Sequence, residues 1–234
     1  MPGVSGLIRV GHKGAGHVAP GNTVASFEAA LEHGVDMIEF DVLRTRDGRL
    51  VLAHDYADAG RRECMTLEHG LELFAGEAYA GVQLDVDLKL PGYEREVLEG
   101  LARYGLVERS LVSTMYVESL DRLGELEPAL RRGWSVPRVE RDYLNARLAV
   151  RVPVYAVAGY MRARMPRLAS ARIRAGGCEA IMAHRILVGA RLVRAVHRAG
   201  GQLYVWTVDD AARIRALEAL GVDGVITNDP RLFD

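Results

Sequence analysis

Short apolar segments recur along the whole chain, and most of them precede a segment with the periodicity of an amphipathic helix. Strands that alternate with helices pair in parallel, because each helix returns the chain to the start of the next strand. Eight such units in 234 residues predict a small (β/α)₈ TIM barrel, with a doubly wound open sheet as the rival. The eight strand candidates are residues 7–11, 36–42, 82–90, 109–115, 130–136, 178–184, 202–208 and 223–229.

Between these strands the apolar residues recur at helical spacing. Residues 138–177 carry no clear pattern, and Pro153 and Pro166 predict that no single long helix spans them. Proline lacks a backbone N–H, and its ring clashes with the preceding helical turn. No composition shift marks a domain boundary, so we expect one domain over residues 1–234. The predicted helices are residues 22–34, 94–105, 117–126, 189–201 and 210–221.

The second strand candidate is followed by RTRDGRL, residues 44–50, which is typical of a tight turn. Asp-Gly pairs adopt the backbone conformations that such turns require. We therefore expect a β-hairpin after the second strand, which returns the chain to His54 and Asp55.

The charge balance of the chain restricts its partners. A formal net charge of -1 argues against a nucleic-acid partner, because proteins that bind phosphate backbones usually carry a basic excess. The first residues lack the pattern of a secretory signal, and no apolar run approaches the roughly 18 residues that span a bilayer. We expect a cytoplasmic protein without a stable membrane anchor, and the sequence does not indicate an oligomeric state.

Carboxylates and basic residues gather at the predicted ends of the strands. In a parallel barrel the active site lies at the carboxyl ends of the strands, so side chains there bear on function. Asp85, Asp87 and Lys89 share one face of the third strand, because side chains alternate with a period of two. The other candidates at strand ends or after the hairpin are His12, Lys13, Glu39, Asp41, His54 and Trp206.

Several carboxylates at one barrel mouth would repel one another unless one is protonated or a cation is bound. Carboxylate oxygens suit a hard divalent ion, Mg²⁺ or Ca²⁺. The alternative is an acidic strand face that is exposed to solvent or paired with Arg44 and Lys89. Both interpretations remain open from the residues alone.

Two histidines, His12 and His54, flank Glu39 and Asp41 in the chain. An ion that polarises a phosphoryl oxygen, with one imidazole as base and another as acid, is an arrangement for phosphodiester cleavage. Lys13 and Lys89 could neutralise the phosphate oxygens. Trp206 is either a barrel-core aromatic or an apolar wall against the substrate.

Four motifs, in this order and spacing, resemble the glycerophosphodiester phosphodiesterase family and bracket nearly the whole chain. They are HKGAGHVAPGNTVASFEAAL from residue 12, GVDMIEFDVLRTRDGRLVLAHD from residue 34, LDVDLK from residue 84, and YVWTVDD with GVDGVITNDP from residue 204 onward. The resemblance implies a metal-dependent barrel enzyme that hydrolyses glycerophosphodiesters to an alcohol and glycerol 3-phosphate. It implies an acid–base pair of His12 and His54, metal ligands Glu39, Asp41 and Asp87, and Lys89 at the substrate phosphate.

Venom-type sphingomyelinase D phospholipases look like relatives, and their third metal ligand is an aspartate, as Asp87 would be here. One alternative function is therefore a lyase-type enzyme that releases a cyclic phosphate from a lysophospholipid. Another is a catalytically weakened barrel that binds phosphodiesters.

The sequence departs from the family pattern at several positions. Lys13 replaces an arginine, Gly21 replaces a glutamate, and Asp87 replaces a longer glutamate. The family's usual insertion after the His54 region is shortened or absent. We therefore expect a more open site than in other family members.

Overall fold

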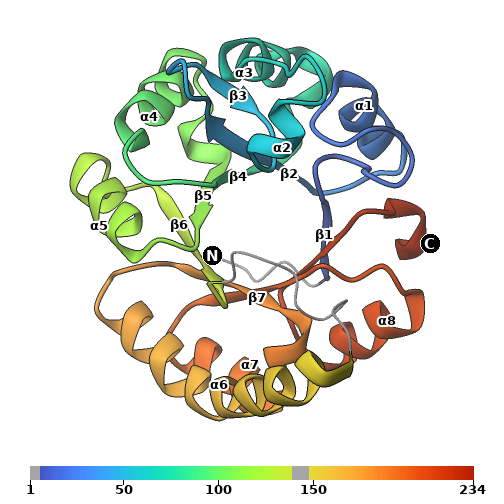
Figure 1. Cartoon of the computed structure of the whole chain (residues 1–234), viewed down its shortest axis with the longest axis vertical. Helices are drawn as coiled ribbons and strands as arrows, with labels where there is room; N and C mark the ends of the chain where they lie inside the picture. Colours follow the sequence, from blue (N-terminus) through green and yellow to red (C-terminus); the bar gives the residue numbers. More distant parts are fainter. Residues whose placement is uncertain (1–5, 139–147) are drawn as a thin grey trace.

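A nine-stranded sheet closes into a barrel in this computed structural model, which describes residues 6–138 and 148–234 (Figure 1). The strands pair in parallel around the ring, and β1 closes it by pairing with both β2 and β9. Among the described strands, β3 alone runs antiparallel, against β2. All eight strand candidates are confirmed. The parallel strands are β1 (Ile8–Gly11), β2 (Met37–Arg44), β4 (Gln83–Leu88), β5 (Ser110–Thr114), β6 (Arg131–Val136), β7 (Ala180–His184), β8 (Gln202–Trp206) and β9 (Gly224–Thr227).

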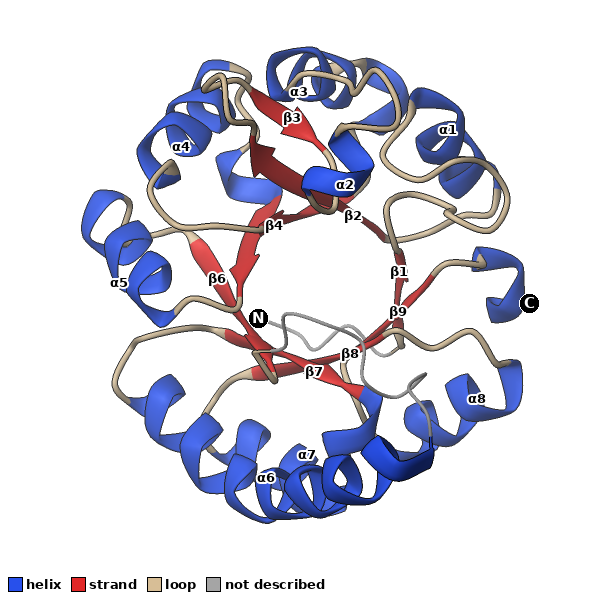
Figure 2. Ribbon diagram, viewed as in Figure 1, coloured by secondary structure: helices blue, strands red, loops and turns tan. Residues whose placement is uncertain are grey.

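Helices surround the barrel on its outer side (Figure 2). The five predicted helices are present, and a further helix, α3, precedes β4. The alternation of strands and helices therefore gives a (β/α)₈ barrel rather than an open sheet. The helices are α1 (Val24–Glu32), α2 (Tyr56–Ala59), α3 (Leu67–Ala75), α4 (Glu94–Arg103), α5 (Val117–Leu126), α6 (Leu148–Arg174), α7 (Ala190–Arg198) and α8 (Ala211–Leu220), with short 3₁₀ turns η1 (Glu77–Tyr79), η2 (Val107–Arg109), η4 (Arg185–Leu187) and η5 (Pro230–Phe233).

The strands are apolar on both faces because both faces are covered. One set of side chains, including Val10, Met37 and Tyr204, fills the barrel interior. The opposite faces pack against the helices, where Phe40 of β2 stacks on Phe74 of α3 at 4.9 Å between ring centroids. Burying each large apolar side chain stabilises the fold by about 1.5–3 kcal/mol. This packing holds the strand ends, and the polar side chains on them, in fixed positions.

The predicted hairpin is present as β2 and β3 (Leu50–Leu52). Gly48 adopts a φ of +90°, a conformation that only glycine takes without strain. The hairpin is fastened by a hydrogen bond from the Thr45 N–H to the Arg49 carbonyl, 2.8 Å. It returns the chain toward the barrel mouth, where His54 follows β3.

Pro153 and Pro166 both lie inside α6, so the prediction that they prevent a single long helix is wrong. A proline inside a helix costs roughly 3 kcal/mol through its missing hydrogen bond and its ring clash. Met165, Ala169 and Ile173 recur one helical turn apart on α6 and are buried against the barrel and α7. This packing outweighs the local penalty, which a reading of the sequence alone does not reveal. The remainder of the unpatterned segment, residues 139–147, lies outside the described residues.

Two smaller findings concern the helices and the cysteines. None of the helices in the described part of the chain is both long enough and apolar enough to cross a membrane. Cys64 and Cys178 are free thiols.

Candidate active site

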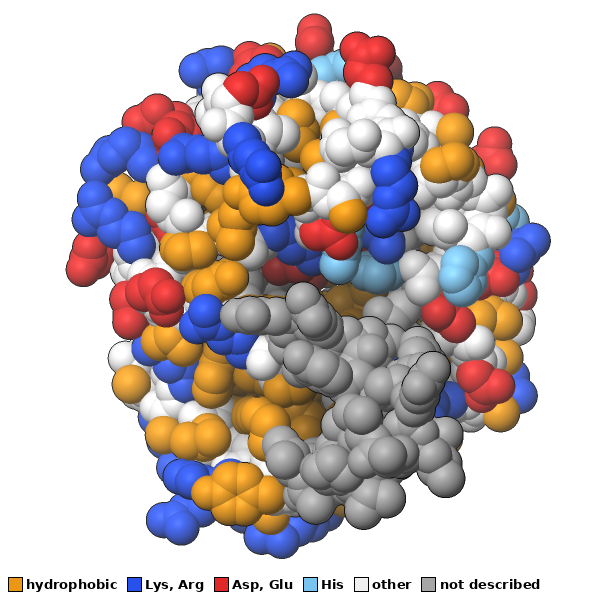
Figure 3. Space-filling view, viewed as in Figure 1, with side chains coloured by type: hydrophobic (Ala, Val, Ile, Leu, Met, Phe, Trp, Pro, Cys, Tyr) orange, Lys and Arg blue, Asp and Glu red, His pale blue; other side chains and the backbone are white. Residues whose placement is uncertain are grey.

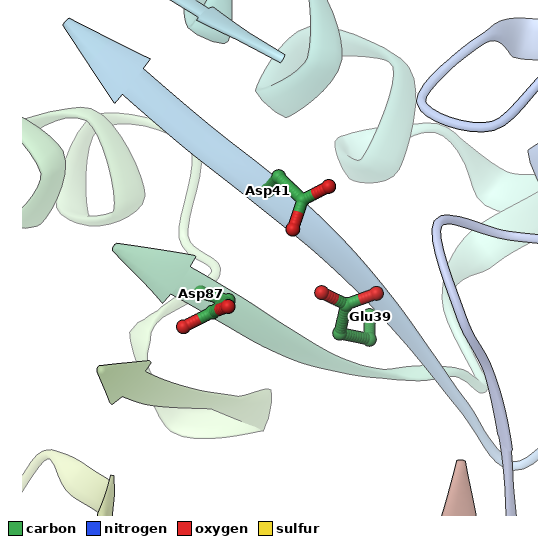
Figure 4. A group of neighbouring side chains, drawn as sticks. All are labelled: Glu39, Asp41 and Asp87. Atoms are coloured by element: carbon green, nitrogen blue, oxygen red, sulfur yellow. The ribbon is translucent and has the colours of Figure 1, made fainter. Parts of the chain in front are cut away.

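Three carboxylates converge at the carboxyl ends of two neighbouring strands. Glu39 and Asp41 come from β2, and Asp87 comes from β4, where it is the direct register partner of Asp41. One oxygen from each of the three lies within 4.8 Å of the others. Figure 4 shows Glu39 and Asp41 on β2 and Asp87 on the neighbouring strand β4. Since Glu39 and Asp41 are buried, their charges are poorly screened by water.

The ammonium group of Lys89 neutralises part of this charge. Its Nζ lies 2.5 Å from Asp41 Oδ1 and 2.5 Å from Asp87 Oδ2. Arg44 instead pairs with Glu96 on the outside of the barrel. The sequence left open that the acidic residues pair with Arg44 and Lys89. Lys89 does pair with them, and Arg44 does not. One ammonium against three carboxylates leaves an excess of negative charge.

The excess of negative charge shifts the pKa values of Glu39, Asp41 and Lys89. Burial and the neighbouring Asp41 raise the pKa of Glu39 well above its ordinary value. Burial also opposes ionisation of Asp41, but the positive charges around it, Lys89 foremost, hold the pKa of this carboxyl below its ordinary value. Burial lowers the pKa of Lys89, but the surrounding carboxylates, Asp41 foremost, together raise it well above its ordinary value, so this ammonium stays charged. The cluster therefore favours an additional positive charge near Glu39.

His12 follows β1 and faces the same cluster. Its Nδ1 lies 2.7 Å from Asn228 Oδ1, while the Asn228 amide nitrogen donates to Asp209 Oδ2 at 2.8 Å. Because the amide oxygen accepts, Nδ1 carries the proton, and Nε2 is the basic nitrogen. Nε2 lies 3.9 Å from Glu39 Oε2. Burial, with a smaller contribution from Lys13, lowers the pKa of His12 to about 4, so the imidazole is neutral at pH 7.

His54 reaches the site from the end of the hairpin. Its side chain is 53% exposed, and Nδ1 lies 3.3 Å from Asp55 Oδ2. The backbone N–H of His54 donates to Asp58 Oδ2 at 3.2 Å, which fixes the chain at this point. His54 therefore sits at the solvent side of the site, whereas His12 lies deeper.

A cavity of about 130 Å³ joins these residues at the barrel mouth. Figure 3 shows histidine and acidic side chains together near the centre of this face. Asp41 is fully buried and does not line the cavity, but its carboxylate contacts Lys89, which does. Lys13 is not among the residues that line the cavity. The predicted site residues that do line it are His12, Glu39, His54, Asp87, Lys89 and Trp206.

Trp206 forms part of the cavity wall. Its Nε1 donates to the Met182 carbonyl at 2.7 Å, and its ring meets the His184 ring edge-on at 5.0 Å between centroids. The ring also packs against the apolar barrel interior. Both interpretations of Trp206 therefore describe part of its surroundings.

Lys13 and Gly21 depart from the family pattern together, and they are in contact. A Cβ placed on Gly21 would lie 2.9 Å from Lys13 Cβ and 3.5 Å from Lys13 Cε. The lysine chain thus occupies the space that a side chain at position 21 would need. Lys13 contacts Glu39 through its backbone, whose N–H donates to Glu39 Oε2 at 2.7 Å.

Three polar residues of the site were not assigned a role from the sequence. Asn22 donates from Nδ2 to Asp41 Oδ2 at 2.8 Å, and its Oδ1 accepts from the Asp41 N–H at 3.2 Å. Its φ is +60°, a conformation in which asparagine is enriched, so the asparagine of the motif GNT was the available sign of a special backbone position. Asn228 orients His12, and Asp85 lines the floor of the cavity. Burial, followed by the charge of Asp87, raises the pKa of Asp85 to about 8.

Comparison with protein families identifies relatives of the whole barrel. The model of the glycerophosphoryl diester phosphodiesterase family matches residues 12–68 and 81–232. The two matched ranges contain all the site residues described above. The unmatched residues 69–80 lie in the segment between β3 and β4, where a shortened insertion was predicted.

Curated relatives are named as glycerophosphodiester phosphodiesterases. A glycerophosphodiester phosphodiesterase of Caldanaerobacter subterraneus subsp. tengcongensis is 26% identical over 94% of this chain and 93% of its own length. The Arabidopsis thaliana glycerophosphodiester phosphodiesterase GDPD4 is 29% identical over 95% of this chain and 70% of its own length.

Solved structures share the fold. A glycerophosphodiester phosphodiesterase from Parabacteroides distasonis superposes with a TM-score of 0.74 at 18% identity, covering 97% of this chain and 94% of its own. An Oleispira antarctica phosphodiesterase in complex with the product sn-glycerol-3-phosphate superposes with a TM-score of 0.67 at 20% identity, covering 96% of this chain and 94% of its own.

Proposed function

The chain belongs to the glycerophosphoryl diester phosphodiesterase family, and from this premise we propose that it hydrolyses glycerophosphodiesters to an alcohol and glycerol 3-phosphate. The observation that carries the proposal is the meeting of three carboxylates, two histidines and Lys89 at one barrel mouth. The Oleispira antarctica relative binds the product sn-glycerol-3-phosphate, which supports the same product here.

We propose Glu39, Asp41 and Asp87 as the ligands of one divalent ion, Mg²⁺ or Ca²⁺. The donor set fits, because these ions prefer carboxylate oxygens, and ligands about 2.0–2.6 Å from an ion lie within roughly 5 Å of one another. The three oxygens here lie within 4.8 Å. The raised pKa of Glu39 also supports a cation, since one ammonium leaves two of the three carboxylate charges uncompensated. A bound divalent ion would polarise the phosphoryl oxygen and offset its negative charge.

We assign the base to His12 and the acid to His54. Neutral His12, with Nδ1–H held by Asn228, can accept a proton at Nε2 from the attacking 2-hydroxyl of the glycerol. As the new P–O bond forms, the bond to the alcohol breaks, and His54 protonates the departing oxygen. Water then opens the cyclic phosphate with the two roles reversed, and glycerol 3-phosphate leaves. The exposed position of His54 suits a leaving group that departs toward solvent.

Lys89 and Trp206 are proposed to hold the substrate. Lys89 lines the cavity and stays charged, so it can neutralise phosphate oxygens. Trp206 offers an apolar face to the glycerol or lipid portion. The side chain of Lys13 lies beside Gly21, so we propose for it only a contribution of positive charge near the phosphate.

Substitution of the two histidines tests this proposal. His12→Ala and His54→Ala should each lower turnover of a glycerophosphodiester by about 100-fold or more, the usual contribution of a positioned acid or base. His197→Ala is the matched control, because His197 is an exposed histidine on α7 that pairs with Asp223. Turnover near that of the unsubstituted protein in either site variant, with an unchanged melting temperature, would contradict the assignment.

The second candidate, a lyase that stops at the cyclic phosphate, is favoured by the exposure of the acid. Because His54 is half exposed at the rim, a cyclic product could leave before water attacks. Phosphorus NMR of the reaction separates the two functions. Accumulation of glycerol 3-phosphate supports hydrolysis, and a cyclic phosphate that persists after the substrate is consumed supports the lyase.

A further inference from the structure

A groove of about 510 Å³ runs between α6 and α7 on the outer surface of the barrel. These two helices lie side by side in the outer ring, away from the active-site mouth (Figure 2). Ser170 and Ala195 bring them close, because the Ser170 hydroxyl donates to the Ala195 carbonyl at 2.9 Å. The walls of this arginine groove are five exposed arginines, Arg167, Arg174, Arg191, Arg194 and Arg198.

The groove lies in a strongly basic part of a chain with a net charge of -1. Residues 159–208 contain nine arginines, no lysine and a single acidic residue, Glu179. Glu179 pairs with Arg132 and not with the groove. Positive charge is therefore concentrated here and is compensated elsewhere in the chain.

The five arginines lack ion-pair partners among the described residues. Other arginines of the outer ring are paired, such as Arg44 with Glu96, Arg103 with Glu68, and Arg172 with Asp121. Arg172 shares α6 with two groove arginines, so proximity to this helix does not by itself prevent pairing. Arg198 donates from Nε to the Arg194 carbonyl at 3.1 Å, and its terminal nitrogens and the other four guanidinium groups remain available to an anion.

The spacing of the arginines lines them up along the groove. Arg167 and Arg174 are seven residues apart on α6, and Arg191 and Arg198 are seven apart on α7. Seven residues are two helical turns, or roughly 10 Å, so each pair lies on one face of its helix. Like charges at such distances repel one another. A multivalent anion in the groove would relieve this repulsion along its whole length.

We propose that the arginine groove binds a ligand with several closely spaced phosphates, an oligophosphate or the triphosphate of a nucleotide. Guanidinium groups bind phosphate in a bidentate manner, which lysine cannot do. The volume is within the roughly 300–1,000 Å³ of small-molecule sites. None of the described residues that line the groove is aromatic, so these residues do not offer the stacking platforms of single-stranded nucleic-acid sites. A flat lipid surface would contact the rims and leave the recessed floor empty.

Calorimetric titration with inorganic tripolyphosphate tests the proposal on the full chain. Divalent ions are first removed from the protein, because tripolyphosphate binds them. We expect saturable binding that weakens about tenfold or more in the double variant Arg167→Gln/Arg194→Gln. The control is Arg213→Gln/Arg215→Gln, which removes the same charge from two exposed arginines of α8. This control should change the affinity less than twofold, and melting temperatures should verify that both variants fold.

Parallel titrations with a nucleoside triphosphate and inorganic phosphate identify the source of the phosphates. Equal affinity for tripolyphosphate and the nucleotide indicates recognition of the phosphates alone, and tighter nucleotide binding indicates a nucleotide ligand. The proposal is overturned if neither polyphosphate binds, or if the groove variant and the α8 variant weaken binding equally. Binding to anionic vesicles or to a single-stranded oligonucleotide, without binding of tripolyphosphate, would overturn it as well.

Discussion

At the scale of single residues, the site is a balance between three carboxylates and one ammonium. Lys89 contacts Asp41 and Asp87, while Glu39 is left with burial and a raised pKa. The cluster can therefore contain both a structural ion pair and a metal site. The same lysine can neutralise two carboxylates and leave the third in need of a cation.

Asn22 gives a residue-scale prediction about the proposed metal site. It holds Asp41 by hydrogen bonds to both the carboxylate and the backbone N–H. Loss of a group that orients a ligand typically weakens metal affinity 10–100-fold. Asn22→Ala should therefore weaken divalent-ion binding by about tenfold or more, as measured by calorimetry with Mg²⁺ and with Ca²⁺. Unchanged affinity for the ion that binds would show that Asn22 does not support the site.

At the scale of elements, the start of α4 depends on a buried carboxylate. Glu94 accepts from the Gly92 N–H at 3.0 Å and from the Ser119 hydroxyl at 2.5 Å, and so ties α4 to α5. Burial opposes its ionisation, but these hydrogen bonds lower the pKa of Glu94 below its ordinary value. A lowered pKa stabilises the fold above the unfolded-state pKa, and this stability is lost as the pH falls through the folded-state pKa.

Glu94→Gln should lower the free energy of unfolding by about 1–2 kcal/mol at pH 7, because hydrogen bonds to a charged group are lost. The difference between the two proteins should shrink as the pH falls below the unfolded-state pKa of about 4.3, and it is lost as Glu94 becomes protonated in the folded protein. Urea unfolding at pH 7 and pH 3.5 measures both quantities. An equal difference at the two pH values would contradict the role of the ionised carboxylate.

Helix α6 gives the second element-scale prediction. Pro166 lies within it and cannot donate a backbone hydrogen bond, while Met165 and Ala169 hold the helix in place by burial. Pro166→Ala should raise the free energy of unfolding by about 1–2 kcal/mol, since part of the roughly 3 kcal/mol gained in the helix is offset by a more flexible unfolded chain. Thermal unfolding tests this, and a lower melting temperature would mean that the proline ring itself contributes to packing.

At the scale of the whole molecule, the barrel is largely predictable from the sequence. Strands that are covered on both faces must be short apolar runs, and eight of them alternate with helical patterns. The hairpin followed from Asp47-Gly48. Helix α6 did not follow, because its stability comes from contacts with α7 that no local pattern encodes. That residues 1–234 form one domain stays a prediction.

The candidate site was predictable only in part. Carboxylates and histidines at strand ends meet because the ends of parallel strands meet. The supporting amides were missed, since Asn22 acts on a residue 19 positions away and Asn228 on one 216 positions away. Polar residues of loops show no periodic pattern in the sequence. Which side chains they contact depends on how the strands close into the barrel. The contact of Lys13 with Gly21 is of the same kind.

We propose that this barrel hydrolyses a glycerophosphodiester with the help of an ion at Glu39, Asp41 and Asp87. The most direct test of this claim is the rate of glycerol 3-phosphate release from glycerophosphocholine by protein stripped with a chelator, before and after addition of Mg²⁺ or Ca²⁺. The rate should be near zero in the stripped protein and restored by one of these ions. It should not be restored in Asp87→Ala, although Glu72→Ala, which removes an exposed carboxylate of α3, should behave like the unsubstituted protein. Full activity in the stripped protein, or full restoration in Asp87→Ala, would contradict the claim.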